Sequence, residues 1–521
     1  MNKVAKSTCI LILITILSKC FGFIRETTLV SIHGASSVTD AYITAMNIPS
    51  VMFATIASAL ATTFIPLFFD IRNKEGETNS LKFSNNVFNI VVILSLILAS
   101  LGFIFAKPII KVFAMNFKGE QLILATNFAK IMMIGTVFIG LNNILSSWLQ
   151  IKENFIIPGI IGIPYNLIII LFIIISSKNN VYIMVIGTII ATIVQFIIQF
   201  FSSYKTGFRY SIYLNLKDKN IKKMISLIVP VFIGVGVAQL NTVVDKSLAS
   251  TLGNGMITIL NSANRLDSFV SQIFVANIIT VLYPLLSMLS IENDKTNFSL
   301  AIKKSINSII IITIPISVVS IILSEPIVRL VFERGQFNSK DTILTSQALA
   351  CYSIGMCAFG VRALLNKIFY SLKDTKTPMI NGTITVLLNI LLNIVFIKFM
   401  GHIGLALATS ISSILCTVLM FKDLKKLIKG FNNYNTIYTL IKSLVASIFM
   451  GTIVKLVYTG IIAIGVSSTV NLISIGISIL IGSIIYILVL VILRVDEIKD
   501  TYLFLLNKII NLKLNKKVDA N

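Results

Sequence analysis

Long apolar segments recur along almost the whole of this chain, and they constrain its fold more than any other feature. The runs are about 20 residues or longer, which is the length a helix needs to cross the hydrocarbon core of a bilayer. They are rich in Ile and Leu and lack the ten-residue alternation of barrel strands. Only 12% of the 521 residues are charged and the mean hydropathy is +0.91, whereas soluble domains carry about 25% charged residues. The sequence therefore predicts an all-α polytopic membrane protein.

The apolar runs predict about fourteen transmembrane helices. A further segment, 496–514, alternates apolar residues with lysines and predicts an amphipathic helix on the membrane surface. The fourteen predicted spans are 7–33, 40–70, 84–113, 121–150, 156–177, 181–204, 223–251, 256–289, 302–332, 341–371, 379–398, 403–428, 437–463 and 468–493.

The chain carries 44 basic and 21 acidic residues, a formal net charge of +23. The excess lies in short loops between apolar runs rather than on one folded face, so nucleic-acid binding is not expected. Alternate loops hold most of the lysines and arginines, and the positive-inside rule then places both termini in the cytoplasm. An even number of spans agrees with this orientation. We expect a multi-pass membrane protein.

Short motifs recur at an offset near 218 and indicate an internal repeat. Lys107-Pro108-Ile109-Ile110 matches Glu325-Pro326-Ile327-Val328, and the Pro66 region matches the Pro284 region. Each repeat spans about six helices, so both halves share one orientation and are related by an axis along the membrane normal. The predicted organisation is an N-lobe (1–210), a C-lobe (211–430), two extra helices (431–495), and a cytoplasmic amphipathic helix with the tail (496–521).

The first apolar run contains Lys19, Arg25 and Glu26, and Asp40 follows just after it. A charge at the centre of a spanning helix costs roughly 3 kcal/mol on insertion scales, so such residues usually face a watery cavity. One interpretation is a cationic cavity wall that receives an anionic group. The other is that Lys19 reaches the membrane surface while Arg25 forms a structural pair with Glu26 or Asp40.

The second half supplies Arg265, at the position that Asn47 occupies in the first repeat. The repeat therefore does not itself require a basic side chain there, which favours a functional role. Arginine also suits phosphate because its planar guanidinium donates two hydrogen bonds at once. Arg362 is a further intramembrane base that either lines the cavity or forms a structural pair.

Asp245 lies in the seventh predicted span beside Lys246, and a local ion pair is one interpretation. The alternative is a cation site, because Asn389 and Asn393 lie one helical turn apart and Thr409 lies on the next helix. Hard cations such as Na⁺ prefer oxygen ligands of this kind.

Histidine-based catalysis and a cysteine metal site are not expected. The chain has two histidines, and its five cysteines all lie in apolar runs without metal-ligand spacing. A membrane-embedded glycosyltransferase or lipid phosphatase needs carboxylates or histidines clustered at one interface, and the acidic residues are too dispersed to supply that cluster. We therefore predict a transporter and not an enzyme.

Three motifs resemble those of the MurJ (MviN) lipid II flippases, a family of the multidrug/oligosaccharidyl-lipid/polysaccharide exporter superfamily. They are SKCFGFIRE at 18–26 with Gly34, TDAY and Asn47-Ile48-Pro49, then VFERGQF at 331–337, and FYSLKDTKTP at 369–378. The local physics of the last motif predicts Thr377 as an N-cap and Pro378 as the first helical residue.

The resemblance implies that the chain moves undecaprenyl-pyrophosphate-linked disaccharide-pentapeptide from the inner to the outer leaflet of a bacterial plasma membrane. We expect transport by alternating access, with the lipid tail in a groove formed by the two extra helices (431–495). It maps substrate-binding residues onto Arg25, Arg265, Glu26 and Asp40, with Lys19 standing where arginine is usual. It maps a Na⁺ site onto Asp245, Asn389, Asn393, Thr409 and the backbone carbonyl of Leu405, so that Na⁺ is the candidate coupling ion. No other cofactor is expected. The implied partners are lipid II, membrane lipids and the cell-wall synthesis machinery.

Other functions stay open at this point. The nearest is a flippase for another polyprenyl-linked glycan, such as a capsule, teichoic or O-unit precursor. A cation-coupled drug exporter fits less well, because cationic substrates suit acidic cavities. A non-transporting scaffold for cell-wall synthesis is a further alternative.

Overall fold

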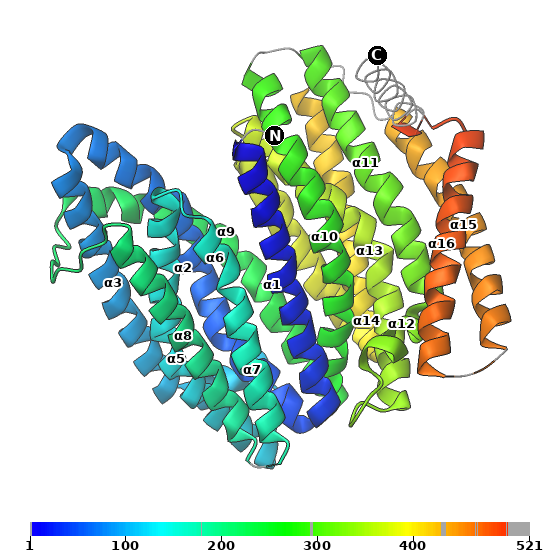
Figure 1. Cartoon of the computed structure of the whole chain (residues 1–521), viewed down its shortest axis with the longest axis horizontal. Coiled ribbons are helices and arrows are strands. Elements are labelled where there is room, and N and C mark those ends of the chain that lie inside the picture. The colour runs from blue at the N-terminus through cyan, green and yellow to red at the C-terminus, as the bar shows by residue number, and fades with distance from the viewer. Residues whose placement is uncertain are drawn as a thin grey trace, which may run out of the picture. The chain divides into compact units, whose positions relative to one another are not determined.

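The computed structural model describes residues 3–178, 180–291, 295–428, 434–463, 465, 467–495 and 497–498, and the regular secondary structure in this part of the chain is all helical, without a strand (Figure 1). The predicted amphipathic helix at 496–514 lies outside the described residues apart from 497 and 498. The helices are α1 (Lys3–His33), α2 (Ser37–Glu75), α3 (Glu77–Ile104), α4 (Ala106–Phe113), α5 (Gly119–Ile151), α6 (Ile156–Ile160), α7 (Gly162–Ser176), α8 (Tyr182–Lys205), α9 (Lys219–Ala249), η1 (Ser250–Leu252), α10 (Met256–Ile291), α11 (Lys295–Ile322), α12 (Ser324–Phe332), α13 (Ser339–Ser371), α14 (Lys376–Leu427), α15 (Tyr434–Ile462) and α16 (Ser468–Ile492).

The all-helical prediction is confirmed, and each of the fourteen predicted ranges is helical over most of its length. Within the described residues, ten helices are long and apolar enough to cross a membrane. The count of fourteen spans stays a prediction.

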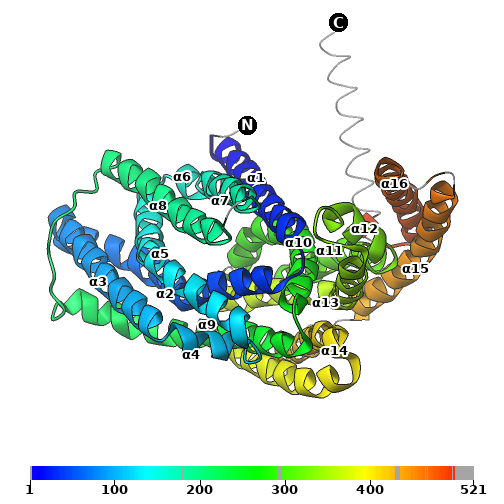
Figure 2. The same cartoon turned by 90° about the horizontal axis from the view of Figure 1, so that it is seen from below.

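Packing divides the chain into two compact units. Unit 1 comprises Met1–Arg265, Phe332–Thr342 and Val386–Leu405; unit 2 comprises Leu266–Val331, Ile343–Thr385 and Ala406–Asn521. In unit 1, α2, α3 and α5 pack around a core that contains Phe64, Phe83 and Trp148. In unit 2, α15 and α16 lie side by side (Figures 1 and 2), and Ser443 hydrogen-bonds Tyr486 between them at 2.7 Å. The lobes predicted from the repeat stay a prediction.

Three predicted helices are each broken once, so their continuous ranges 84–113, 156–177 and 302–332 are wrong in this detail. The breaks separate α3 from α4, α6 from α7, and α11 from α12. In each case a proline (Pro108, Pro164 or Pro326) is the third residue of the second helix. A proline ring clashes with the carbonyl four residues earlier, and that carbonyl belongs to the last residue of the first helix.

α14 contains the two spans predicted at 379–398 and 403–428. Gly401 interrupts it with φ 57° and ψ −130°, a backbone conformation that glycine adopts without steric cost. A Cβ added to Gly404 would lie 2.6 Å from the carbonyl oxygen of Phe396, and Asn381 Nδ2 donates to Asp423 Oδ2 at 3.0 Å. These contacts join residues on either side of the break, so the two halves form a hairpin, as predicted.

The local backbone repeats at an offset of 220, two residues more than that of the proline motifs. Glu153 and Lys373 both have positive φ, 58° and 60°. The next residue of each turn, Asn154 or Asp374, donates its N–H to the carbonyl five residues earlier, at 2.8 and 2.9 Å. Its side chain then accepts the N–H three residues later, at 3.4 and 3.0 Å. The two halves of the sequence therefore build the same turn.

The prediction that Thr377 caps α14 is wrong. Asp374 Oδ1 accepts the N–H groups of Lys376 and Thr377 at 3.1 and 3.0 Å, and Asp374 Oδ2 accepts the Thr377 hydroxyl at 2.7 Å. Asp374 is therefore the capping residue, and Pro378 lies in the helix rather than at its first position. The carboxylate outcompetes the hydroxyl because it accepts several bonds at once.

Candidate functional site

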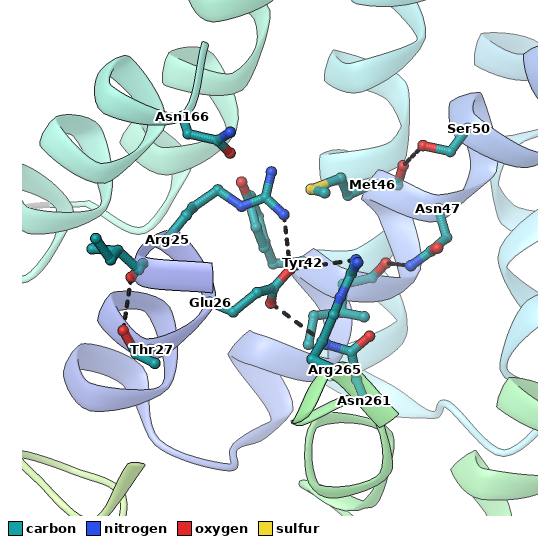
Figure 3. Close-up of polar contacts among 12 residues, drawn as sticks. Arg25, Glu26, Thr27, Tyr42, Met46, Asn47, Ser50, Asn166, Asn261 and Arg265 are labelled. Carbon is teal, nitrogen blue, oxygen red and sulfur yellow. Dashed lines mark hydrogen bonds and ion pairs between the residues drawn. The ribbon is translucent and has the colours of Figure 1, made fainter. Parts of the chain in front are cut away.

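Two arginines from distant parts of the sequence share one carboxylate in unit 1 (Figure 3). Arg25 and Glu26 are adjacent on α1, and the Arg25 guanidinium donates to Glu26 Oε1 at 2.8 Å. Arg265, on α10, approaches the same Oε1 atom at 3.5 Å. Asn261, one helical turn before Arg265, donates to Glu26 Oε2 at 3.4 Å. The structure thus brings together three of the predicted site residues.

The charge of this group is unbalanced, because two guanidinium groups face one carboxylate. The side chains of Arg25 and Glu26 are 10% and 7% exposed, whereas that of Arg265 is 46% exposed. Removing two charges from water is costly, and a buried pair persists only with additional hydrogen bonds. The exposed Arg265 guanidinium therefore offers donor groups to an anion. Arg25 and Glu26 form the buried part of the site.

A small pocket adjoins the two arginines. Within unit 1, Tyr42 lies beside the cluster (Figure 3). Its hydroxyl hydrogen-bonds Thr188 at 2.7 Å. The pocket is lined by Arg25, Glu26, Leu29, Tyr42, Ile43, Met46, Asn47, Asn261 and Arg265. The sequence prediction missed Asn261 and Tyr42. Asn261 could have been found from its spacing of four residues from Arg265, which places both on one helix face.

Asp40 does not pair with Arg25 in this structure. Its carboxylate accepts the N–H of Gly255 at 2.6 Å, the N–H of Thr258 at 2.8 Å and the Thr258 hydroxyl at 2.6 Å. Main-chain N–H groups at the start of a helix lack helical partners. The buried Asp40 carboxylate supplies the missing acceptors at the N-terminus of α10. Of the two structural pairs considered for Arg25, the structure contains the one with Glu26.

The turns around Asp40 approach one another very closely. Gln336 donates its N–H to the carbonyl of Ser31 at 2.8 Å. A Cβ on Gly335 would lie 2.1 Å from that carbonyl oxygen, and a Cβ on Gly255 would lie 2.3 Å from the Ala35 carbonyl oxygen. Both glycines have positive φ, at 63° and 84°. The VFERGQF motif therefore closes against the C-terminal end of α1.

Two predicted substrate residues lie elsewhere. Lys19 precedes Arg25 by six residues on α1, about 9 Å along the helix axis. Arg362 belongs to α13 in unit 2, where its guanidinium lies over the Phe359 ring at 5.3 Å. The structure therefore assembles Arg25, Glu26 and Arg265. The substrate roles of Lys19 and Arg362 stay predictions.

The candidate cation ligands are partly assembled in unit 1. Asn393 Nδ2 lies 2.6 Å from Asp245 Oδ1 and 2.9 Å from Asn389 Oδ1, and Asn241 donates to Asp245 Oδ2 at 3.1 Å. Leu405 belongs to the same unit and Thr409 to unit 2. In this arrangement the oxygens of Asp245 and Asn389 both accept from the Asn393 amide nitrogen, so the sodium site stays a prediction. The described residues contain no cluster of three His, Cys, Asp or Glu side chains able to hold a metal.

A multi-pass helical membrane protein in which a buried and a half-exposed arginine share one carboxylate fits the class of membrane carriers. A sequence model of the family described as "Lipid II flippase MurJ" matches residues 29–475, so the chain belongs to that family. A "Lipid II flippase MurJ" of Thermosipho africanus is 30% identical over 412 residues, covering 79% of this chain and 84% of the relative.

Solved structures agree with this assignment. One described as "Lipid II flippase MurJ, inward closed conformation" has a TM-score of 0.80 and 30% identity, covering 92% of this chain and 97% of its own. An inward-facing multidrug resistance MATE transporter of the MOP superfamily matches with a TM-score of 0.64 and 15% identity, covering 80% of this chain and 96% of its own. That second likeness concerns the fold alone.

Proposed function

We propose that this chain carries lipid II between the leaflets of a bacterial plasma membrane by alternating access. A flippase is a transporter, and its substrate is an anionic lipid-linked glycan. Family membership supports the substrate, and the likeness to a flippase in an inward closed conformation supports alternating access. The cytoplasmic position of both termini and contacts with the cell-wall synthesis machinery belong to the same proposal.

The proposed headgroup site is the pair Arg25 and Arg265. One observation carries it: both guanidinium groups converge on a single carboxylate oxygen of Glu26 (Figure 3). An anion with two phosphates can replace that carboxylate and bind both arginines through bidentate hydrogen bonds. Glu26 is then the counter-ion of the empty site, which keeps the two arginines close together without substrate.

The contacts around Asp40 support a role in sealing one side of the carrier. Alternating access requires a seal that can open and re-form. The bonds from Asp40 to Gly255 and Thr258, with the Ser31–Gln336 contact, join three turns of unit 1. Asp40 therefore acts on transport through the conformation, while Lys19 and Arg362 are the further basic residues proposed to meet the substrate.

Sodium is the proposed coupling ion. Asp245, Asn389 and Asn393 would hold it, with the Leu405 carbonyl and Thr409 as further oxygen ligands. A cation moving inward offsets the membrane potential that opposes export of an anion, about 2.3 kcal/mol per charge per 100 mV. The tail of the substrate would lie along α15 and α16.

The test is flipping of labelled lipid II in proteoliposomes. Arg25→Ala and Arg265→Ala should each lower the initial rate roughly ten- to hundredfold, because hydrogen bonds to charged groups contribute about 1.5–3 kcal/mol. Arg72→Ala, at an exposed arginine near the end of α2, is the matched control and should leave the rate unchanged. Wild-type rates in both arginine variants would refute the headgroup site.

Complementation separates the substrates. The wild-type gene should restore growth to a strain depleted of its lipid II flippase. Purified protein that flips a labelled capsule or teichoic precursor but not lipid II would assign the alternative substrate. A protein that flips neither would favour the scaffold.

A further inference from the structure

The segment that joins α8 to α9 is fixed to α3 by three asparagines. Asn85 donates to the carbonyl of Arg209 at 3.0 Å and accepts the N–H of Ser211 at 2.8 Å. Asn89 donates to the carbonyl of Ser211 at 3.1 Å. Asn86 donates to the carbonyl of Asn215 at 2.9 Å and accepts its N–H at the same distance. These amides satisfy the main chain of the segment as a neighbouring strand would.

We call residues 208–217 the strap. Its alternate side chains, Tyr210, Ile212, Leu214 and Leu216, are exposed, and Ile212 is 90% exposed. The three asparagines hold the strap in one register, so the position of its last residues is fixed. Leu216 and Lys217 are therefore held at the start of α9.

An apolar groove of about 630 Å³ begins at Leu216 and runs between α2, α3 and α9, which are neighbours in Figures 1 and 2. Its volume lies within the roughly 300–1,000 Å³ of ligand sites. Leu94, Ile225 and Leu240 line it and are 37%, 51% and 57% exposed, so the groove opens onto the surface of these helices. Nearly all other lining side chains are apolar, Gln239 being the exception.

Two lysines mark the rim at the strap end. Leu216 and Ile221 both line the groove, and each is followed by an exposed lysine, Lys217 or Lys222. In the part of the chain that the structure describes, neither lysine forms an ion pair.

The neighbouring lysines are neutralised. Lys219 pairs with Glu75 and Lys223 pairs with Asp70, each at 3.1 Å. Lys217 and Lys222 therefore keep their positive charges, and each follows a residue that lines the apolar groove. That combination matches a molecule with hydrocarbon chains and one anionic headgroup.

We propose that this groove binds one anionic glycerophospholipid of the surrounding bilayer, with its acyl chains between α3 and α9 and its phosphate at Lys217 and Lys222. Charge complementarity decides between the possible occupants, because a zwitterionic lipid gains no net attraction from the two lysines. The site is independent of Arg25 and Arg265, so this lipid is a resident ligand and not the transported substrate.

The experiment uses the full-length protein in nanodiscs with photo-crosslinkable phosphatidylglycerol or phosphatidylcholine that carry a diazirine in the acyl chain. Mass spectrometry of the peptides should find phosphatidylglycerol on α3 and α9 segments that line the groove. The preference over phosphatidylcholine should be about 25-fold, since each lysine contributes about fivefold.

Two variants test the two parts of the site. Lys217→Gln/Lys222→Gln should abolish the preference but retain labelling, and Leu94→Trp should block labelling by filling the groove. The control is Lys107→Gln/Lys111→Gln, which removes the same charge from exposed positions of α4 and should leave both unchanged.

Three results would overturn the proposal. They are equal labelling by the two lipids, a preference that survives loss of both rim lysines, and displacement of phosphatidylglycerol by undecaprenyl pyrophosphate, which would assign the groove to the carrier lipid. If the phosphatidylglycerol preference does not depend on Lys217 and Lys222 but the protein still flips lipid II, the lipid site is refuted and the proposed function stands.

Discussion

Asp40 binds Thr258 through both the main-chain N–H and the hydroxyl of that residue, at 2.8 and 2.6 Å, and the two residues are 218 positions apart. That separation equals the offset of the repeated motifs at Pro108 and Pro326. Asp40 and Thr258 therefore occupy equivalent places in the two halves of the sequence, in the first turns of α2 and α10. Equivalent elements that contact each other are typical of a two-fold relationship between repeats.

Asp40→Asn should destabilise the protein by about 1–3 kcal/mol, because one amide oxygen cannot replace a carboxylate that accepts three hydrogen bonds. Thermal unfolding in detergent measures the loss. Thr258→Val removes only the hydroxyl bond and should cost about 1 kcal/mol. Equal unfolding temperatures for Asp40→Asn and the wild type would contradict the capping role.

Glu26→Gln should leave Arg25 and Arg265 without their shared negative charge, at a cost of about 3–5 kcal/mol. Inorganic pyrophosphate should restore part of the lost unfolding temperature, since it supplies the missing charge. Glu325→Gln, at an exposed pair with Arg329, is the control and should show neither effect. A Glu26→Gln protein that does not respond to pyrophosphate would argue against an anion site.

Gly335→Ala should destabilise the protein by at least about 2 kcal/mol. The new methyl group would lie 2.1 Å from the Ser31 carbonyl oxygen, on a backbone with φ of 63°, and such a backbone already disfavours residues with a Cβ. Gly476→Ala lies in α16 with no heavy atom within 4 Å of its added Cβ and should be neutral or stabilising. Unfolding temperatures compare the two, and similar values would show that the turn tolerates a side chain.

Asn393→Asp should make stability depend on sodium. It places a second carboxylate beside Asp245, where the present amide nitrogen is 2.6 Å from Asp245 Oδ1, and two adjacent carboxylates repel without a cation. The variant should unfold at a lower temperature in choline chloride and recover in sodium chloride. Recovery that is no larger than that of the wild type would count against a cation site there.

Asp374→Ala should cost about 1 kcal/mol through loss of the α14 cap. Burial acts to raise the pKa of Asp374, but hydrogen bonds from Thr377 and Lys376 outweigh it, so its pKa lies below the ordinary 3.8. A lowered carboxyl pKa means that the stabilisation is complete above pH 3.8 and is lost as the pH falls through the lower, folded-state pKa. The difference in unfolding temperature between wild type and variant should therefore be constant near neutral pH and shrink only in strong acid. A difference that already shrinks between about pH 6 and pH 5 would contradict the lowered pKa.

Much of the fold follows from local sequence. Apolar runs set the helices, and the Gly401 break separates the two spans of α14 as predicted. The helix breaks near Pro108, Pro164 and Pro326 could also have been predicted, because the clash of a proline with a carbonyl four residues earlier is itself local.

The candidate site was predictable only as a set of residue types. Insertion costs single out four residues, because a charge in an apolar run is costly unless it is paired or faces water. They are Arg25, Glu26, Asp40 and Arg265. Which of these side chains pair is a different question. Hydropathy and spacing describe neighbours within a few helical turns, whereas Arg265 reaches Glu26 and Asp40 reaches Thr258 across more than 200 positions.

The sequence by itself therefore determined the helices and the charges that lie among them, and it predicted the repeat. Only the tertiary structure decided that Glu26 joins the two arginines, that Asp40 caps α10, and that three asparagines of α3 fix the strap beside an apolar groove. The physical reason is that helix formation in a membrane satisfies each backbone group locally, while side-chain partners are chosen by which helices pack together.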